Sequence, residues 1–68
     1  MDPTLEKSPH ELVNTLLNTG WTQSELAEEV GISQPSISRI AVNPTIRPRH
    51  DIVDHLRHLV RVTSNTDA

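Results

Sequence analysis

The sequence predicts an all-α domain of four to five short helices, and three observations lead to that expectation. Trp21 is the single aromatic residue, so the core has to be aliphatic, which favours helices over an aromatic-rich β-sandwich. Helix-capping residues precede stretches whose apolar residues recur at helical spacing. A length of 68 residues supports one domain, expected over residues 8–62, between a flexible arm at 1–7 and a flexible tail at 63–68.

The first expected helix spans residues 9–19. Ser8 is its N-cap, Pro9 occupies the first helical position, where no amide donor is needed, and Glu11 closes a capping box. Gly20 supplies the left-handed residue that ends the helix. One apolar stripe follows from the spacing i, i+1, i+4, i+5 and contains Leu12, Val13, Leu16 and Leu17.

Two further short helices are expected at residues 23–30 and 34–41, joined by a tight turn. Thr22 opens the first of them with a capping box, and Ser33 caps the second. Gly31 ends the first helix because so tight a turn requires a positive φ. The residues expected to face inward are Leu26, Ala27, Val30, Ile32, Ile37, Ile40 and Ala41.

The last helix is expected to begin near residues 48–50 and to run to about Val62. Asn43-Pro44 ends the preceding helix, since a proline moves the residue before it out of the helical region. Residues 45–49 then form a stiff, basic connector. The apolar positions of the last helix are Ile52, Val53, Leu56, Leu59 and Val60, which again lie on one face.

Charge is distributed unevenly along the chain. The formal net charge is -3, which taken alone argues against a nucleic-acid partner. Between Val30 and His50, however, there is no acidic residue, whereas Arg39, Arg47 and Arg49 all lie there. One end of the molecule is therefore locally positive on an acidic body, a pattern that still suits phosphate. Chance clustering in a small chain is the alternative explanation.

A six-residue pattern between positions 22 and 40 points to a family. It consists of Gln23, Ala27, Gly31, Ile32, Ile37 and Ile40. In type and spacing it resembles the helix-turn-helix of lambdoid phage repressor and Cro domains, and Thr45-x-Arg47-Pro48-Arg49 resembles the segment after their recognition helix. The resemblance covers residues 10–56. It implies a lambda-repressor-like domain, double-stranded DNA as the partner, and a homodimeric transcriptional regulator in the cytoplasm of a bacterial or phage-infected cell, at the nucleoid.

The resemblance also implies that the 34–41 helix lies in the DNA major groove. Gln34 would bond adenine N6 and N7, and Arg39 would take guanine O6 and N7 or a phosphate. For Arg39 the alternative is a surface ion pair with a glutamate of the 23–30 helix. Pro35 departs from the family, which usually has a polar residue there, and suits a thymine methyl. The expected base contacts are Gln34, Pro35, Ser36 and Arg39.

A second set of residues would contact the DNA backbone or a narrow minor groove. Gln23, in the first turn of its helix, would bind a phosphate with the help of the helix dipole. Pro44 and Ile46 stand where related chains often carry lysine, which removes phosphate contacts. The expected set is Gln23, Ser38, Asn43, Thr45, Arg47, Arg49 and His50.

The dimer interface is not defined by the sequence. Related repressor domains often use a fifth helix for it, and none is evident here. Leu59, Val60 and Val62 therefore serve either the dimer or the core. Dimerisation itself is expected because one recognition helix offers few contacts to a long operator.

Other function classes fit the sequence less well. His50, His55 and His58 lack the cysteines or clustered carboxylates that would complete a metal site, so a solvated helix face is preferred. No Gly-rich loop or nucleophile elbow is present, and so small a core does not enclose a pocket, so we expect no enzyme, no cofactor and no small-molecule ligand. The lack of a long apolar run or signal peptide predicts an intracellular chain with no membrane partner.

Two alternative functions stay open. The acidic body suits a helix-turn-helix module or antitoxin that binds a protein partner instead of DNA. The chain is also interpretable as the DNA-binding fragment of a longer regulator, although the Met1 start and polar ends favour a complete small protein.

Overall fold

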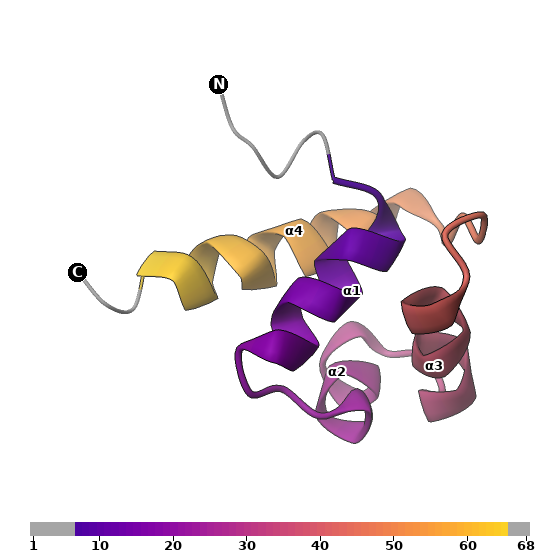
Figure 1. Ribbon diagram of the computed structural model, residues 1–68, viewed down its shortest axis with the longest axis horizontal. Helices are drawn as coiled ribbons and strands as arrows, with labels where there is room; N and C mark the ends of the chain where they lie inside the picture. Colours follow the sequence, from indigo (N-terminus) through magenta and orange to yellow (C-terminus); the bar gives the residue numbers. More distant parts are fainter. Residues whose placement is uncertain (1–6, 66–68) are drawn as a thin grey trace.

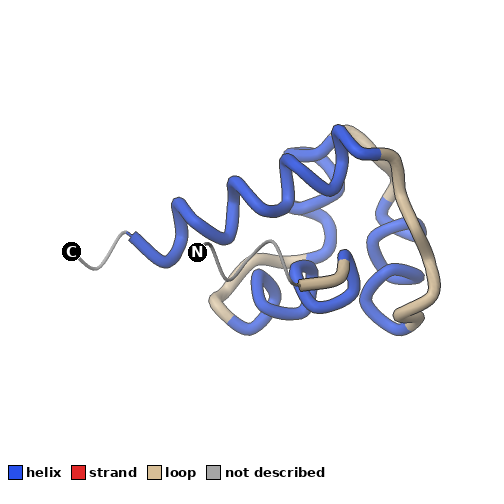
Figure 2. Tube along the Cα trace, turned by 90° about the horizontal axis from the view of Figure 1, so that it is seen from above, coloured by secondary structure: helices blue, strands red, loops and turns tan. Residues whose placement is uncertain are grey.

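The computed structural model describes residues 7–65 and folds them into four α-helices without a strand in that range. They are α1 (Pro9–Asn18), α2 (Gln23–Val30), α3 (Gln34–Val42) and α4 (His50–Asn65). The expected all-α class is confirmed. In Figure 1, α1 lies between α4 and the α2–α3 pair, and in Figures 1 and 2 the second half of α4 extends beyond the other helices. No helix in this part of the chain is both long and apolar enough to cross a membrane.

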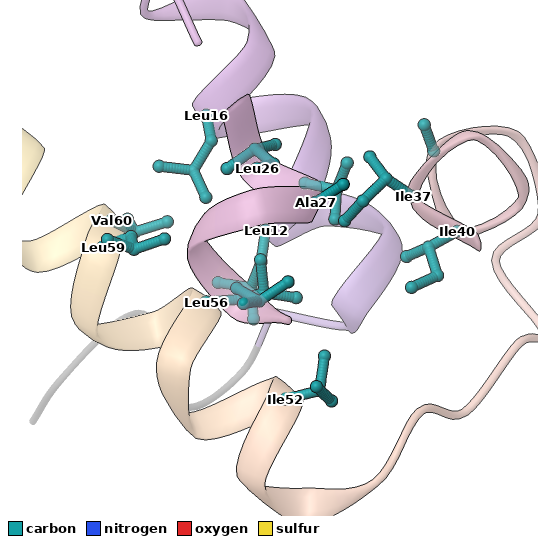
Figure 3. Packing of buried hydrophobic residues seen from close by; sticks show 13 residues of the cluster. Leu12, Leu16, Leu26, Ala27, Ile37, Ile40, Ile52, Leu56, Leu59 and Val60 are labelled. Atoms are coloured by element: carbon teal, nitrogen blue, oxygen red, sulfur yellow. The ribbon is translucent and has the colours of Figure 1, made fainter. Parts of the chain in front are cut away.

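One aliphatic core joins the four helices, and α1 is its centre because it packs against both α4 and α3. Figure 3 shows leucine and isoleucine side chains from every helix converging on it. A fully buried aliphatic side chain contributes roughly 1.5–3 kcal/mol, so these contacts provide the main stabilisation of so short a chain. The buried residues of this hydrophobic core, all at apolar positions predicted from helical spacing, are Leu12, Val13, Leu16, Leu26, Ala27, Val30, Ile37, Ile40, Ala41, Ile52, Leu56, Leu59 and Val60.

The ends of α1 differ in detail from the prediction. Ser8 Oγ accepts the Glu11 N–H at 3.3 Å, but the return bond that would complete a capping box is not formed in the described structure. The helix ends one residue early, with Thr19 as its C-cap. Gly20 has a φ of +116°, which is positive but outside the left-handed helical region. Its N–H and that of Trp21 turn back to the last α1 carbonyls, at 3.3 and 3.2 Å.

The turn between α2 and α3 follows the sequence closely. The capping box at Thr22 is complete, since its Oγ1 accepts the Glu25 N–H at 3.0 Å and its own N–H donates to Glu25 Oε1 at 2.9 Å. Gly31 ends α2 with a left-handed φ of 77°. The carbonyl of Ala27 accepts the N–H groups of both Gly31 and Ile32, at 2.9 and 3.1 Å. The glycine therefore lets the chain reverse within three residues and begin α3 at once.

The last helix continues to Asn65, three residues past the predicted end at Val62. A long-range contact supports this extension. Trp21 Nε1 donates to Thr63 Oγ1 at 3.4 Å, which holds the last turn of α4 against the α1–α2 corner. The predicted tail at 63–68 is thus helical over its first three residues, and the rest lies outside the described residues. So does the predicted arm apart from Lys7, whose Nζ lies 3.5 Å from Thr15 Oγ1.

Candidate nucleic-acid interface

The outward face of α3 carries the residues predicted to contact bases. Gln34, Pro35 and Arg39 are exposed, and Ser36 is half-buried. Ser33 caps the helix by accepting the Ser36 N–H at 3.3 Å, and the hydroxyls of the two serines lie 2.9 Å apart. The Ser36 hydroxyl thus already holds the first turn of α3, and it keeps spare capacity because a hydroxyl both donates and accepts.

Arg39 makes no ion pair with any residue from 7 to 65. The predicted alternative, pairing with an α2 glutamate, is therefore not realised. Glu29 is paired elsewhere, with its Oε2 3.3 Å from Nε2 of His55 on α4. Arg39 lies in the last turn of α3, where the helix dipole favours a cation. Its charge therefore has no acidic partner among the described residues.

The C-terminal end of α3 is held by two polar side chains of α1. His10 Nδ1 lies 3.1 Å from the carbonyl oxygen of Ile40, which it reaches as a donor. Asn14 Nδ2 donates to the carbonyls of Ala41 at 2.8 Å and of His10 at 2.9 Å. Carbonyls at a helix end lack intrahelical partners, so these bonds satisfy them and fix the direction of α3. This pair was not predicted, although polar residues at i and i+4 beside an apolar stripe were a signal for it.

The connector between α3 and α4 begins with a side-chain turn. Asn43 Oδ1 accepts both the Thr45 N–H at 3.0 Å and the Thr45 hydroxyl at 2.6 Å. The two residues therefore have a structural task besides the DNA contact predicted for them. Arg49 lies 3.5 Å from Asp51, in a pair so exposed that it adds little to stability. Arg47 is exposed and forms no ion pair within the described part of the chain.

A groove of about 470 Å³ runs between α3 and the connector. Arg39, Ser36 and Arg49 lie along it, so the structure brings part of the base-contacting set and part of the backbone set to one surface. Ile46 was noted in the sequence only as a position where related chains often carry lysine. In the structure it is half-buried against the core and lines the groove. The remaining apolar lining comes from Ile32, Ile40, Ile52 and Pro48. Apolar walls with cationic margins suit the sugar and methyl surfaces of a nucleic acid beside its phosphates.

The remaining residues predicted to contact the DNA backbone do not line this groove. Arg47 and His50 line a second pocket, together with two basic residues that were not predicted, Lys7 and Arg57. Gln23 is the first residue of α2 and is half-buried, and Ser38 is half-buried on α3. Within residues 7–65 no cluster of three or more His, Cys, Asp and Glu side chains is arranged to hold a metal ion.

Comparison with known proteins adds a family match. The family described as Helix-turn-helix matches residues 16–50. Putative protein P2 of Acyrthosiphon pisum secondary endosymbiont phage 1 is 52% identical over 44 residues, which are 65% of this chain and 47% of that protein. Antitoxin HipB of Escherichia coli K12 is 46% identical over 41 residues, covering 54% of this chain and 47% of HipB. The chain thus spans about half the length of these relatives. No solved structure matches it.

Proposed function

The chain belongs to the Cro/C1-type helix-turn-helix family of DNA-binding regulators, and from this premise we propose that it binds a near-palindromic operator as a homodimer and represses transcription by occluding polymerase. The observation that supports the proposal best is Arg39, an exposed cation on the outward face of α3 that forms no ion pair with any residue from 7 to 65. Each subunit places α3 in the major groove, and the two half-sites lie about 34 Å apart.

Base recognition is assigned to α3. Gln34 pairs with adenine, Arg39 with guanine, and Pro35 packs against a thymine methyl. Ser36 contacts a base edge from the floor of the groove between α3 and the connector. Because two of these four positions carry small or apolar groups, few hydrogen bonds read each half-site, and a second subunit is needed for specificity.

Backbone and minor-groove contacts are assigned to a rim around that face. Gln23 binds phosphate from the N-terminus of α2, and Arg49 enters the minor groove between half-sites. The rest of the rim consists of Ser38, Asn43, Thr45, Arg47 and His50. These residues set affinity and its salt dependence, whereas the α3 face sets sequence preference.

The homodimer requires an apolar surface outside the core. Leu59 and Val60 are 8% and 5% exposed and belong to the core, whereas Val62 is 46% exposed on the same helix. Val42, at the end of α3, is 75% exposed. These two valines are the candidates for contact with a second copy, Val62 from α4 and Val42 from the edge of the DNA face.

Selection of bound duplexes from a random DNA pool tests the proposal. The expected product is an enriched site with two inverted half-sites whose centres are about 10 base pairs, or a multiple of that, apart. Enrichment of a single half-site would retain DNA binding but reject the homodimer. A pool that shows no enrichment over a protein-free control would reject operator binding altogether.

A second candidate function is an antitoxin-like module, favoured by the similarity to HipB. Its partner would be a basic protein bound by the acidic surface of α2, which carries Glu25, Glu28 and Glu29. Retention on DNA-cellulose at low salt separates the two proposals. An operator-binding protein is retained and elutes as salt rises, whereas a module that binds only protein passes through.

A further inference from the structure

A pocket of about 570 Å³ lies where the start of α1, the connector and the first half of α4 meet. Figure 1 shows that α1 begins beside the start of α4, and these two helices pack against each other. The volume is within the range of roughly 300–1,000 Å³ that is typical of small-ligand pockets. This pocket is separate from the groove beside α3, with which it shares only the residue Pro48.

The ionisable side chains that line this pocket are all basic. Lys7 comes from the segment before α1, Arg47 and His50 from the connector and the start of α4, and Arg57 from two turns further along α4. Among residues 7–65 no aspartate or glutamate lines it, and Asp54, which pairs with Arg57, lies outside the lining, although the chain has nine acidic residues and only six lysines and arginines. The segment before α1 and the connector–α4 region, about 40 residues apart in sequence, thus bring like charges together in an acidic protein, which is unfavourable unless an anion is bound.

Arg57 supplies an independent observation. Its Nη1 is 3.0 Å from Asp54 Oδ1, but its Nε is buried and has no hydrogen-bond partner, unlike any other buried side-chain nitrogen or oxygen described in residues 7–65. A buried donor without a partner is costly, and the cost disappears when an acceptor binds. A guanidinium presents its donors in a planar fork that matches the oxygens of a phosphate.

We propose that this pocket binds a phosphate group, with Arg57 as the planar donor and Lys7 and Arg47 as the charges around it. The positive end of the α1 dipole, at Ser8 and Pro9 on the wall of the pocket, adds to the attraction. The phosphate belongs either to the DNA backbone beyond the α3 contacts or to a small phosphorylated molecule. In the first case the inference rests on the proposed function, and in the second it stands alone.

The first arm of the test uses the DNA-free protein and inorganic phosphate. Phosphate is titrated at constant ionic strength against chloride while the Nε–H resonance of Arg57 and the backbone amides are followed by NMR. A saturable shift at Arg57 and at the start of α1 is expected. Arg57→Gln and Lys7→Gln should each weaken binding about tenfold, through loss of a charge-assisted contact. The matched control is Arg61→Gln, which removes the same charge from α4 outside the pocket and should leave the affinity unchanged.

The second arm measures DNA affinity as a function of salt for the same variants. If the phosphate is that of DNA, Lys7→Gln and Arg57→Gln each reduce the salt slope by about 0.9, whereas Arg61→Gln does not. Lys7→Gln keeps this arm informative if Arg57→Gln fails to fold, because Lys7 precedes the first helix.

The outcomes separate the two sources and the two proposals. A saturable phosphate response that is lost in the pocket variants, together with a DNA salt slope that these variants leave unchanged or with no DNA binding at all, supports a small phosphorylated ligand. A reduced salt slope confined to the pocket variants supports the DNA backbone. The phosphate pocket is overturned if the wild type and both pocket variants bind DNA with the same salt slope and phosphate causes no saturable NMR shift. That result leaves the proposed function intact.

Discussion

The two helices of the motif, α2 and α3, are built on the same plan and have opposite surfaces. They contain 8 and 9 residues, each begins at a hydroxyl N-cap, and each buries three apolar side chains in the core. Outside the core, α2 carries Glu25, Glu28 and Glu29 and no basic residue in its last turn, whereas α3 has no acidic residue and carries Arg39. Packing and charge are thus specified by different faces of the same short helix.

The two helices are also held in place differently. α2 closes its own N-terminus with a complete capping box, and its Glu29 reaches His55 on α4. α3 has a cap at its N-terminus, and its C-terminal carbonyls depend on His10 and Asn14 of α1. Glu25 and Glu29 of α2 thus have partners within the domain, whereas Arg39 of α3 forms no ion pair with any described residue.

The largest expected effects are losses of stability from substitutions on the buried faces of α2 and α3. Leu26→Ala in α2 and Ile37→Ala in α3 each remove a side chain that is 0% exposed, and each should lower the free energy of unfolding by about 2–5 kcal/mol. Urea denaturation followed by circular dichroism measures both. Val42→Ala, at a position 75% exposed, is the control and should change stability by less than about 0.5 kcal/mol. A loss below 1 kcal/mol at either core position would contradict the common packing plan.

The next effect concerns the charge that distinguishes α3. Arg39→Ala should weaken binding to the selected operator by about 1–3 kcal/mol, mostly at one base position, because a bidentate contact to guanine is lost. Competition assays with operators substituted one base pair at a time measure it. Arg61→Ala serves as the control for the loss of one positive charge. Uniform weakening across all sequences would instead assign Arg39 to a phosphate.

A comparable effect is expected where α1 holds the end of α3. Asn14→Leu leaves the Ala41 carbonyl without its 2.8 Å donor and should destabilise the fold by about 1–3 kcal/mol. Operator affinity should fall further than the fraction of unfolded protein explains, because α3 loses a constraint on its direction. Both quantities are measured on the same sample. A drop in stability with affinity unchanged for the folded fraction would limit Asn14 to a structural role.

Smaller effects should separate the two N-caps. Thr22→Ala removes an acceptor at 3.0 Å and disrupts a reciprocal box, whereas Ser33→Ala removes an acceptor at 3.3 Å. We expect losses of about 1–2 kcal/mol and about 0.5–1 kcal/mol respectively, from thermal unfolding. Equal losses would show that the reciprocal bond of the box adds nothing.

The smallest effect is predicted on the acidic face of α2. Glu28 is exposed and forms no ion pair within the described chain, so Glu28→Gln should change stability by less than about 0.5 kcal/mol. It should raise DNA affinity slightly at low salt and not at high salt, because repulsion between exposed charges and phosphate is screened. An affinity loss at low salt would favour a contact between α2 and the partner.

The sequence predicted what is decided locally. The bounds of α2 are as expected because each end is determined by the residue next to it, Thr22 as the N-cap and Gly31 as the C-cap. The end of α4 was predicted too early, since it depends on a bond between Trp21 and Thr63 that no local pattern reveals.

The same limit applies to the candidate site. Arg39 was identified from its place in a motif, but the grouping of Lys7 with Arg57 depends on how α1 crosses α4. Both residues lie outside the segment from Val30 to His50 in which the positive charge was predicted. The hold that His10 and Asn14 exert on α3 is likewise a tertiary contact, between residues 27 or 30 positions apart.

Trp21 gives this protein a built-in optical reporter. It is the only aromatic residue of the chain, so its indole accounts for all of the intrinsic fluorescence excited at long ultraviolet wavelengths. The indole N–H bonds to Thr63 and the ring packs on the edge of the core. Its emission therefore reports whether the final turns of α4 are docked on the α1–α2 corner, and fraying of that helix end should be visible as a red shift before the rest of the domain unfolds.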